Sequence, residues 1–259
     1  MEVTMSKRKY LITAAGGNGT AIQILDQSLS RAQYVEYGRE LGKEMEAHGA
    51  EQAGFLILKD NHFEMAGGEF CGNASRAAAV LLSKLQKKPN PSFTISGYRG
   101  RVEAVVEKRG DENYFVRCIF PGMPVECISV VLSSGQNADI VDLGGIVHVV
   151  IKGVFPAEKS AYESAHRSIM SELGLENRGA VGTIWYENVG GVVTMHPVVW
   201  VKDVDTFFYE QSCGSGTIAV GKITGLSSII QPTGKSIEAV IGNDAVVLAS
   251  EMEIASVQD

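Results

Sequence analysis

Two cysteines of this chain stand in nearly the same sequence context. Cys71 opens Cys-Gly-Asn-Ala-Ser and Cys213 opens Cys-Gly-Ser-Gly-Thr, and small helix-forming residues follow both. Each cysteine is therefore predicted at the start of a helix, where unpaired main-chain N–H groups can bind a carboxylate. The partial positive charge of a helix N-terminus also favours the thiolate, so we expect a lowered thiol pKa at both positions.

Two such helix starts facing each other would suit proton transfer to and from the α-carbon of a bound amino acid. One thiolate could remove the α-proton of a bound amino acid while the opposite thiol supplies a proton to the other face. N–H donors aimed at the carboxylate would stabilise the enediolate-like species between the two steps. This two-base logic requires no cofactor. It assigns catalysis to Cys71 and Cys213 and carboxylate binding to Gly72, Asn73, Gly214 and Ser215.

The chain also reads as two similar halves. The residues around the two cysteines align, and Val102-Glu103-Ala104-Val105 recurs as Ile237-Glu238-Ala239-Val240 after the second cysteine. Such internal similarity predicts a repeated structural unit. We expect an α/β (α+β) fold of two pseudo-symmetric domains, each a curled, mostly antiparallel sheet around a central helix. Residues 1–120 plus 245–259 would form the half that carries Cys71, and residues 121–244 the half that carries Cys213.

Hydrophobic periodicity and breaker residues place the individual elements. Helices are predicted over 33–47, 74–84 and 158–173 and directly after Cys213. A hairpin is predicted over 54–58 and 62–65, and an antiparallel meander over 92–120.

Composition indicates an ordinary globular protein. The 259 residues are 45% hydrophobic and 20% charged, which excludes a disordered chain. A net charge of −7 argues against nucleic acid and against an anionic membrane surface as partners. No apolar stretch approaches the ~18 residues of a membrane span, and no signal peptide is apparent. With four scattered cysteines, we predict a cytoplasmic protein with reduced thiols.

The motifs resemble those of a known superfamily. Glu69–Ala74 and Cys213–Thr217 are similar to the two cysteine motifs of the diaminopimelate epimerase/proline racemase superfamily, over nearly the whole chain. Met65–Ala74 together with Tyr209–Thr217 most resembles the histidine racemases of staphylopine-type metallophore pathways. The resemblance implies an isomerase, an amino-acid racemase or epimerase that works without pyridoxal phosphate.

Four further residues are candidates for the site. Asn18 and Gln52 match binding positions of the superfamily, and Glu51 matches the acidic residue before that glutamine. Glu210, close to Cys213, could accept a hydrogen bond from a substrate ammonium or could be a solvated loop residue. Asn18 could instead satisfy a left-handed turn, and Glu51 could support the loop.

Departures from the superfamily pattern bear on the substrate. The positions that hold the distal amino-carboxylate in diaminopimelate epimerases are occupied here by Met65 or Ala66, Ile146, Ala180 and Gln211. A buried carboxylate without its arginine would be heavily penalised. A single-headed amino acid with a neutral or weakly basic side chain fits better, with histidine as the first candidate. A broad-specificity racemase and a diaminopimelate-type epimerase are the alternatives.

Plainer interpretations remain beside these. His148 lies in an apolar run typical of a core histidine, and Cys118 and Cys127 are expected to be packing residues. No Cys-x-x-Cys occurs, so no metal site is predicted. Outside enzymes, an amino-acid-binding protein or a dithiol redox protein would also explain two facing cysteines. The sequence leaves a homodimer open.

Overall fold

The computed structural model describes residues 5–258, which form sixteen strands and four α-helices. The helices are α1 (Arg31–Met45), α2 (Gly72–Gln86), α3 (Lys159–Glu172) and α4 (Gly214–Thr224). The strands are β1 (Met5–Ala14), β2 (Gly17–Leu25), β3 (Ala50–Ile57), β4 (His62–Met65), β5 (Ser92–Ile95), β6 (Val102–Lys108), β7 (Asn113–Pro121), β8 (Glu126–Val131), β9 (Asn137–Asp142), β10 (Val147–Lys152), β11 (Ala180–Val189), β12 (Val192–Val201), β13 (Thr206–Tyr209), β14 (Ser228–Ile230), β15 (Ser236–Ile241) and β16 (Ala245–Gln258).

The same order of connections occurs twice along the chain. β2 and β3 are parallel and joined through α1, and β4 and β5 are parallel and joined through α2. In the second half, α3 joins the parallel pair β10 and β11, and α4 joins the parallel pair β12 and β14. The other strand pairs of the described chain are antiparallel. The prediction of an α/β fold with mostly antiparallel sheets is confirmed.

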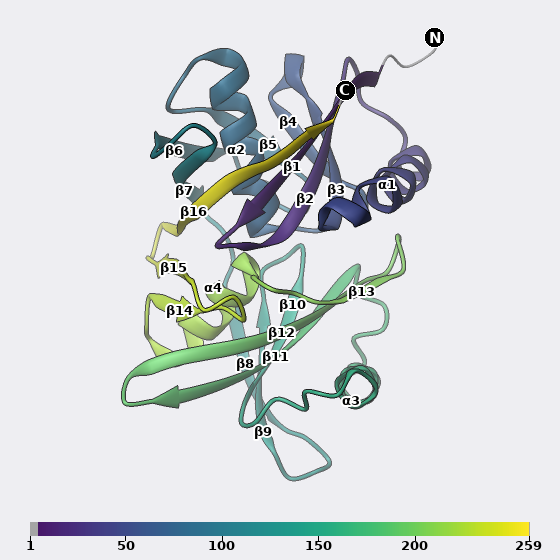
Figure 1. Cartoon of the computed structure of the whole chain (residues 1–259). Helices are drawn as coiled ribbons and strands as arrows, with labels where there is room; N and C mark the ends of the chain where they lie inside the picture. Colours follow the sequence, from purple (N-terminus) through teal and green to yellow (C-terminus); the bar gives the residue numbers. More distant parts are fainter. Residues whose placement is uncertain (1–4, 259) are drawn as a thin grey trace.

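The last strand links the two halves. β16 pairs with β7 along Ala245–Glu253 and with β1 further on, and it also pairs with β15. Figure 1 shows this strand, in yellow, running beside β1 and β7 in one body while β14 and β15 lie towards the other. The division at residues 120 and 245 remains a prediction, and the strand pairing crosses it through β16.

The two cysteine-bearing helices are the buried ones. In α2, the eleven residues Gly72–Leu82 are all buried, and in α4 the first eight, Gly214–Gly221, are buried. Small residues are frequent in both segments, and the polar side chains that they contain are buried with the rest. α1 and α3 are amphipathic instead and bury a single face against the sheet.

Differences from the predicted elements have local causes. α2 begins at Gly72 rather than at residue 74, because the cysteine before it is itself the N-cap. β13 and β14 were not predicted; they span only four and three residues, too few to produce a periodic pattern. Among residues 5–258, the structure contains no helix long and apolar enough to cross a lipid bilayer.

Candidate active site

Both cysteines cap the helices that they precede. Cys71 has extended backbone angles, and its Sγ accepts a hydrogen bond from the N–H of Ala74 at 3.4 Å. Cys213 has similar angles, and its Sγ accepts from the N–H of Gly216 at 3.3 Å. The main-chain carbonyl of Cys71 accepts a hydrogen bond from the hydroxyl of Ser75 at 2.7 Å. That of Cys213 accepts one from the hydroxyl of Thr217, also at 2.7 Å. The repeat in the sequence is therefore a repeat in detailed geometry.

The N-termini of the two helices touch. A Cβ atom added at Gly72 would lie 3.1 Å from the carbonyl carbon of Gly214 and 2.7 Å from a methyl group of Leu248. Asn73 ties the two starts together, since its Nδ2 donates to the carbonyl oxygen of Ser212 at 2.9 Å. A side chain at Gly72 would crowd Leu248 and the Gly214 backbone, and a side chain at Gly214 would crowd Asn73 and Arg76.

One cavity receives both cysteines. Its wall combines the two helix starts with a largely apolar surface and three polar side chains. It is lined by Gln52, Glu69, Phe70, Cys71, Asn73, Ile146, Val199, Val201, Glu210, Cys213, Gly214 and Ser215. We refer to this space as the cysteine cavity.

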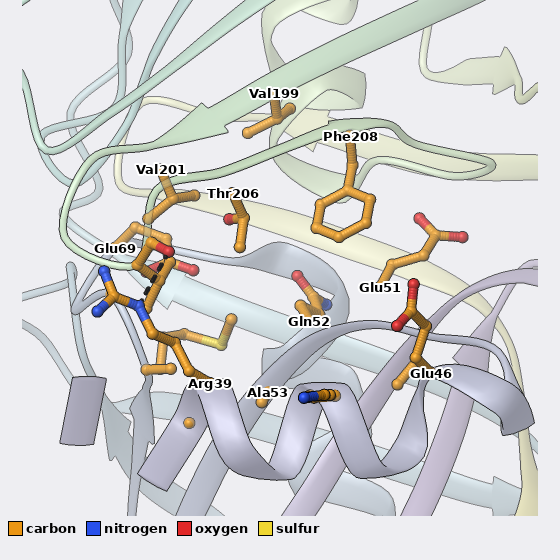
Figure 2. A pocket seen from close by; sticks show the side chains of 18 of the residues that line it. Arg39, Glu46, Glu51, Gln52, Ala53, Glu69, Val199, Val201, Thr206 and Phe208 are labelled. Atoms are coloured by element: carbon orange, nitrogen blue, oxygen red, sulfur yellow. Dashed lines mark hydrogen bonds between the residues drawn. The ribbon is translucent and has the colours of Figure 1, made fainter. Parts of the chain in front are cut away.

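A second cavity, the outer cavity, adjoins the first. It lies between α1 and β3 on one side and β12 and β13 on the other. Figure 2 shows Val199, Val201 and Phe208 on the strands that face Gln52 and Ala53 across it. Both cavities are lined by Gln52, Glu69, Val199, Val201 and Glu210. The outer cavity therefore provides an approach to the cysteines.

Polar partners differ between the two thiols. The Cys71 thiol donates to Oε1 of Gln52 at 3.2 Å, and Nε2 of Gln52 donates to the hydroxyl of Thr20 at 2.7 Å. The Cys213 sulfur instead lies 3.5 Å from the hydroxyl of Ser215.

His148 stands behind that hydroxyl. Its Nε2 lies 2.9 Å from Oγ of Ser215. The histidine is fully buried, as expected of a core histidine, and burial lowers its pKa to about 3. It is therefore neutral near pH 7. Sequence reasoning missed the link, because 67 positions separate the two residues and no local signal joins them.

Three carboxyl groups with raised pKa values line one or both of the cavities. Burial raises the pKa of Glu51 and of Glu69 to about 7, and that of Glu210 to about 8. For Glu51, the N–H groups of Asn18 and Gln211 partly offset this rise by hydrogen bonding to the carboxylate. The Oε2 atom of Glu69 is buried and has no hydrogen-bond partner among the described residues. Glu69 was not predicted as a site residue, although it lines both cavities.

The expectation of lowered thiol pKa values is wrong for this structure. Burial raises the pKa of Cys71 to about 12 and raises the pKa of Cys213 well above its ordinary value. The Glu210 carboxyl, close to both sulfurs, acts in the same direction. The N–H donors at the helix starts lower the pKa as predicted, but desolvation outweighs them.

The remaining predicted residues lie around this centre. Asn18 is buried with a left-handed backbone (φ 48°), and its N–H donates to Glu51 at 3.2 Å. It does not line either cavity, but its side chain is close enough to lower the pKa of Glu210. Glu210 lies in the wall of both cavities rather than in a solvated loop.

The positions that depart from the superfamily pattern are mostly in the wall as well. Ile146 lines the cysteine cavity, and Met65 and Ala66 line the outer cavity. Arg39 also lines the outer cavity (Figure 2), but its guanidinium donates to the main-chain oxygens of Asp203 and Val204. Ala180 is in the wall of neither. The cysteine cavity thus has no arginine in its wall to hold a second carboxylate.

This arrangement brings two thiols and two helix N-termini to one cavity. The helix starts present N–H groups for a single carboxylate. The thiols cap helices whose first residues touch, and both sulfurs face the same cavity. Among residues 5–258, no group of histidine, cysteine and acidic side chains is arranged to hold a metal ion.

Comparisons with known proteins agree with this geometry. Residues 17–241 match the family model described as the histidine racemase CntK N-terminal domain. A histidine racemase of Fusobacterium nucleatum subsp. nucleatum is 33% identical over 219 residues, which cover 79% of this chain and 78% of the relative.

Solved structures share the fold at low identity. A probable proline racemase from Agrobacterium radiobacter K84, with bound carbonate, has a TM-score of 0.64 at 14% identity and covers 99% of this chain and 92% of its own. A hydroxyproline epimerase from Agrobacterium vitis, with bound trans-4-hydroxy-L-proline, has a TM-score of 0.63 at 15% identity, with coverage of 98% and 92%. At these identities the likeness shows the fold alone. The family model and the F. nucleatum relative go further, and by them the chain belongs to the CntK histidine racemase family.

Proposed function

We propose that this protein racemises free histidine, with Cys71 and Cys213 as its two acid–base groups. The observation that carries the proposal is the pair of cysteine N-caps, which open touching helices and line one cavity. Family membership supports the reaction type, and the printed function of the F. nucleatum relative supports the substrate.

The proposed mechanism moves one proton on each face of the α-carbon. One cysteine, as thiolate, removes the α-proton and becomes a thiol, while the C–H electron pair passes into the carboxylate. The other cysteine, as thiol, donates its proton to the opposite face and becomes the thiolate. Main-chain N–H groups of Gly72, Asn73, Gly214 and Ser215 would hold the carboxylate and its enediolate form.

Glu210 is the proposed partner of the substrate ammonium. It lies close enough to both sulfurs to affect their pKa values, so it can reach a group on the carbon between them. A bound ammonium would favour its ionised form. Gln52 holds the Cys71 thiol, and Asn18 and Glu51 support the loop that faces Glu210.

The wall left for the substrate side chain is apolar with one acid. Phe70, Ile146, Val199 and Val201 supply the apolar surface, and Glu69 supplies a carboxyl with an unpartnered oxygen. A flat ring that carries an N–H donor would suit this surface. The distal carboxylate of diaminopimelate would lie near the carboxyl of Glu69, with no arginine in the wall to pair with it. We therefore expect diaminopimelate to be a poor substrate.

A panel of amino acids tests the substrate. The purified protein is incubated under reductant, without pyridoxal phosphate, with each L-amino acid, and chiral chromatography measures the D-form. Conversion of histidine alone supports the narrow assignment, and conversion of many amino acids supports a broad racemase. Rapid epimerisation of diaminopimelate with histidine inert would contradict the proposal. The predicted cytoplasmic location and the homodimer left open by the sequence are separate questions for fractionation and light scattering.

A further inference from the structure

A fully buried arginine lies beside the starts of the two cysteine-capped helices, and the proposed mechanism assigns it no role. Arg76, on the first turns of α2, has no exposed surface and is the largest fully buried side chain of the described residues. Its Nη2 donates to Oδ1 of Asn73 at 2.5 Å, whereas Nε and Nη1 have no hydrogen-bond partner within residues 5–258. A buried charge without an ionic partner is costly, so its retention calls for an explanation.

The guanidinium lies between the two helix starts. A Cβ atom added at Gly214 would be 3.1 Å from both Nη1 and Nη2, so the side chain of an α2 residue reaches the first residue of α4. Helix N-termini carry partial positive charge, and a third positive group beside two of them is unfavourable unless an anion is near.

The groups near Arg76 that can become anionic are thiols. Burial lowers the pKa of Arg76 to about 10, and Cys118, Cys71 and Cys213 act against that shift. Arg76 therefore stays protonated at neutral pH, and both cysteines of the cavity are among the groups that favour its charge. Cys118, on β7, is a further buried thiol. Burial raises its pKa to about 12, and Arg76 acts against that rise.

We propose that Arg76 is a positioning residue that provides one shared positive charge for both catalytic thiolates. During turnover the negative charge would move from one sulfur, through the enediolate, to the other sulfur. A fixed cation between the two helix starts stabilises each of these states. This inference rests on the proposed two-thiol mechanism, and it adds a residue that does not line either cavity.

Asymmetry of the repeat strengthens the inference. In the alignment of the cysteine motifs, the position of Arg76 corresponds to Ile218 in α4, which is also fully buried. Two arginines at one contact would repel each other, so a single one, placed where the helices meet, has to serve both halves.

Other charged groups around the thiols act in the opposite direction. Cys71 is affected by Glu210 and Glu69, and Cys213 by Glu210. Neutral His148 reaches Cys213 only through Ser215. Arg76 is a cation whose charge both sulfurs favour, and it lies beside both helix starts.

The test measures thiol ionisation without requiring turnover. Cys118→Ala serves as the background, because it removes the third thiol near the guanidinium and leaves the cavity wall unchanged. Alkylation of Cys71 and Cys213 by iodoacetamide is followed against pH by mass spectrometry, in that background and with Arg76→Gln or Arg76→Lys. We expect Arg76→Gln to raise the apparent pKa of both thiols by about one unit or more, which is a tenfold loss of thiolate near neutral pH. Arg76→Lys should keep both values within about half a unit, because the charge is retained.

Each outcome decides the matter. Unchanged thiol ionisation in folded Arg76→Gln protein would show a purely structural arginine and overturn the proposal. A rise at one thiol only would overturn the shared role. If Arg76→Gln does not fold, the neutral Arg76→Met variant is titrated in its place: higher pKa values at both thiols support the shared charge, and unchanged values overturn it. Failure of the protein to racemise histidine would be seen in the background variant, separately from these titrations.

Discussion

The surroundings of Cys71 and Cys213 agree in backbone and differ in side chains. Both residues cap a buried helix, with sulfur–nitrogen distances of 3.4 and 3.3 Å and matching 2.7 Å bonds from a following hydroxyl. Apart from these bonds, the thiol of Cys71 donates to the amide oxygen of Gln52, while the sulfur of Cys213 contacts the hydroxyl of Ser215. That hydroxyl in turn lies within hydrogen-bond distance of neutral His148. The repeat therefore preserves the helix-cap geometry at both cysteines. The chemistry around each sulfur is free to differ.

Replacing either cysteine with serine should have the largest effect. A serine hydroxyl is far too weak an acid to replace the thiol, so we expect Cys71→Ser and Cys213→Ser to lower kcat/KM for histidine by roughly 10²–10⁴-fold or more. Each variant keeps one thiol and should still exchange the α-proton of one enantiomer in D₂O, a different enantiomer for each variant. Normal turnover in both single variants would contradict the two-base assignment.

Gly214→Ala should disturb both halves at once. The new methyl group would lie 3.0 Å from Oδ1 of Asn73 and 3.1 Å from the Arg76 guanidinium. We expect a loss of about 1–3 kcal/mol in the free energy of unfolding, measured by urea denaturation, together with slower racemisation. Gly174→Ala is unsuitable as a control because its φ is +66°, but Gly179→Ala meets no atom within 4 Å and should change neither quantity. An unaffected Gly214→Ala variant would show that the contact between the helix starts is not critical.

Glu69 should make the stability of the protein depend on pH. Its pKa is about 7 in the folded protein against an ordinary value of 4.5, so the folded state holds the proton more tightly. The folded state binds more protons than the unfolded state between these values, and stability is lost as the pH rises from about 4.5 through 7. In Glu69→Gln protein, the decrease in the free energy of unfolding over this pH range should be smaller by up to about 3 kcal/mol.

Urea unfolding at pH 5 and pH 8 measures that difference. Glu238→Gln, at an exposed position of β15, is the matched control and should leave the pH dependence unchanged. An equal change in the free energy of unfolding between pH 5 and pH 8 in wild-type and Glu69→Gln protein would contradict the raised pKa of Glu69.

Ser215→Ala should produce the smallest effect and the one most specific to one half. The Ser215 hydroxyl lowers the pKa of Cys213, so its removal should raise that pKa and slow alkylation of Cys213 by about five- to tenfold near neutral pH. Cys71 in the same sample is the internal control and should react as in the wild type. Equal slowing of both thiols would mean that the two surroundings are coupled rather than independent.

The sequence was informative where local patterns determine structure. Paired Cys-Gly motifs predicted two helix starts, and the recurrence of Val102–Val105 as Ile237–Val240 predicted a repeated fold. It was uninformative where tertiary packing decides. The direction of the thiol pKa shifts depends on desolvation inside the folded chain, which outweighs the local N–H donors. The short strand β14 likewise depends on its partners rather than on any pattern of its own.

Parts of the candidate site were also beyond local patterns. Ser215 and His148 are brought together by α4 and β10, and Arg76 is notable only once its burial and its unpartnered nitrogens are known. The carboxyl of Glu69 is identified by its position between two cavities, not by its place in the motif.

The two-base mechanism is tested most directly by the fate of the α-hydrogen. Unlabelled L-histidine is converted by the wild-type protein in D₂O under reductant, and both enantiomers are separated and analysed by mass spectrometry at low conversion. Because separate thiols act on the two faces, the D-histidine formed should carry solvent deuterium at the α-carbon while the remaining L-histidine is still unlabelled. D-histidine that retains the original α-hydrogen, or L-histidine labelled as quickly as the product, would indicate a single base and contradict the account.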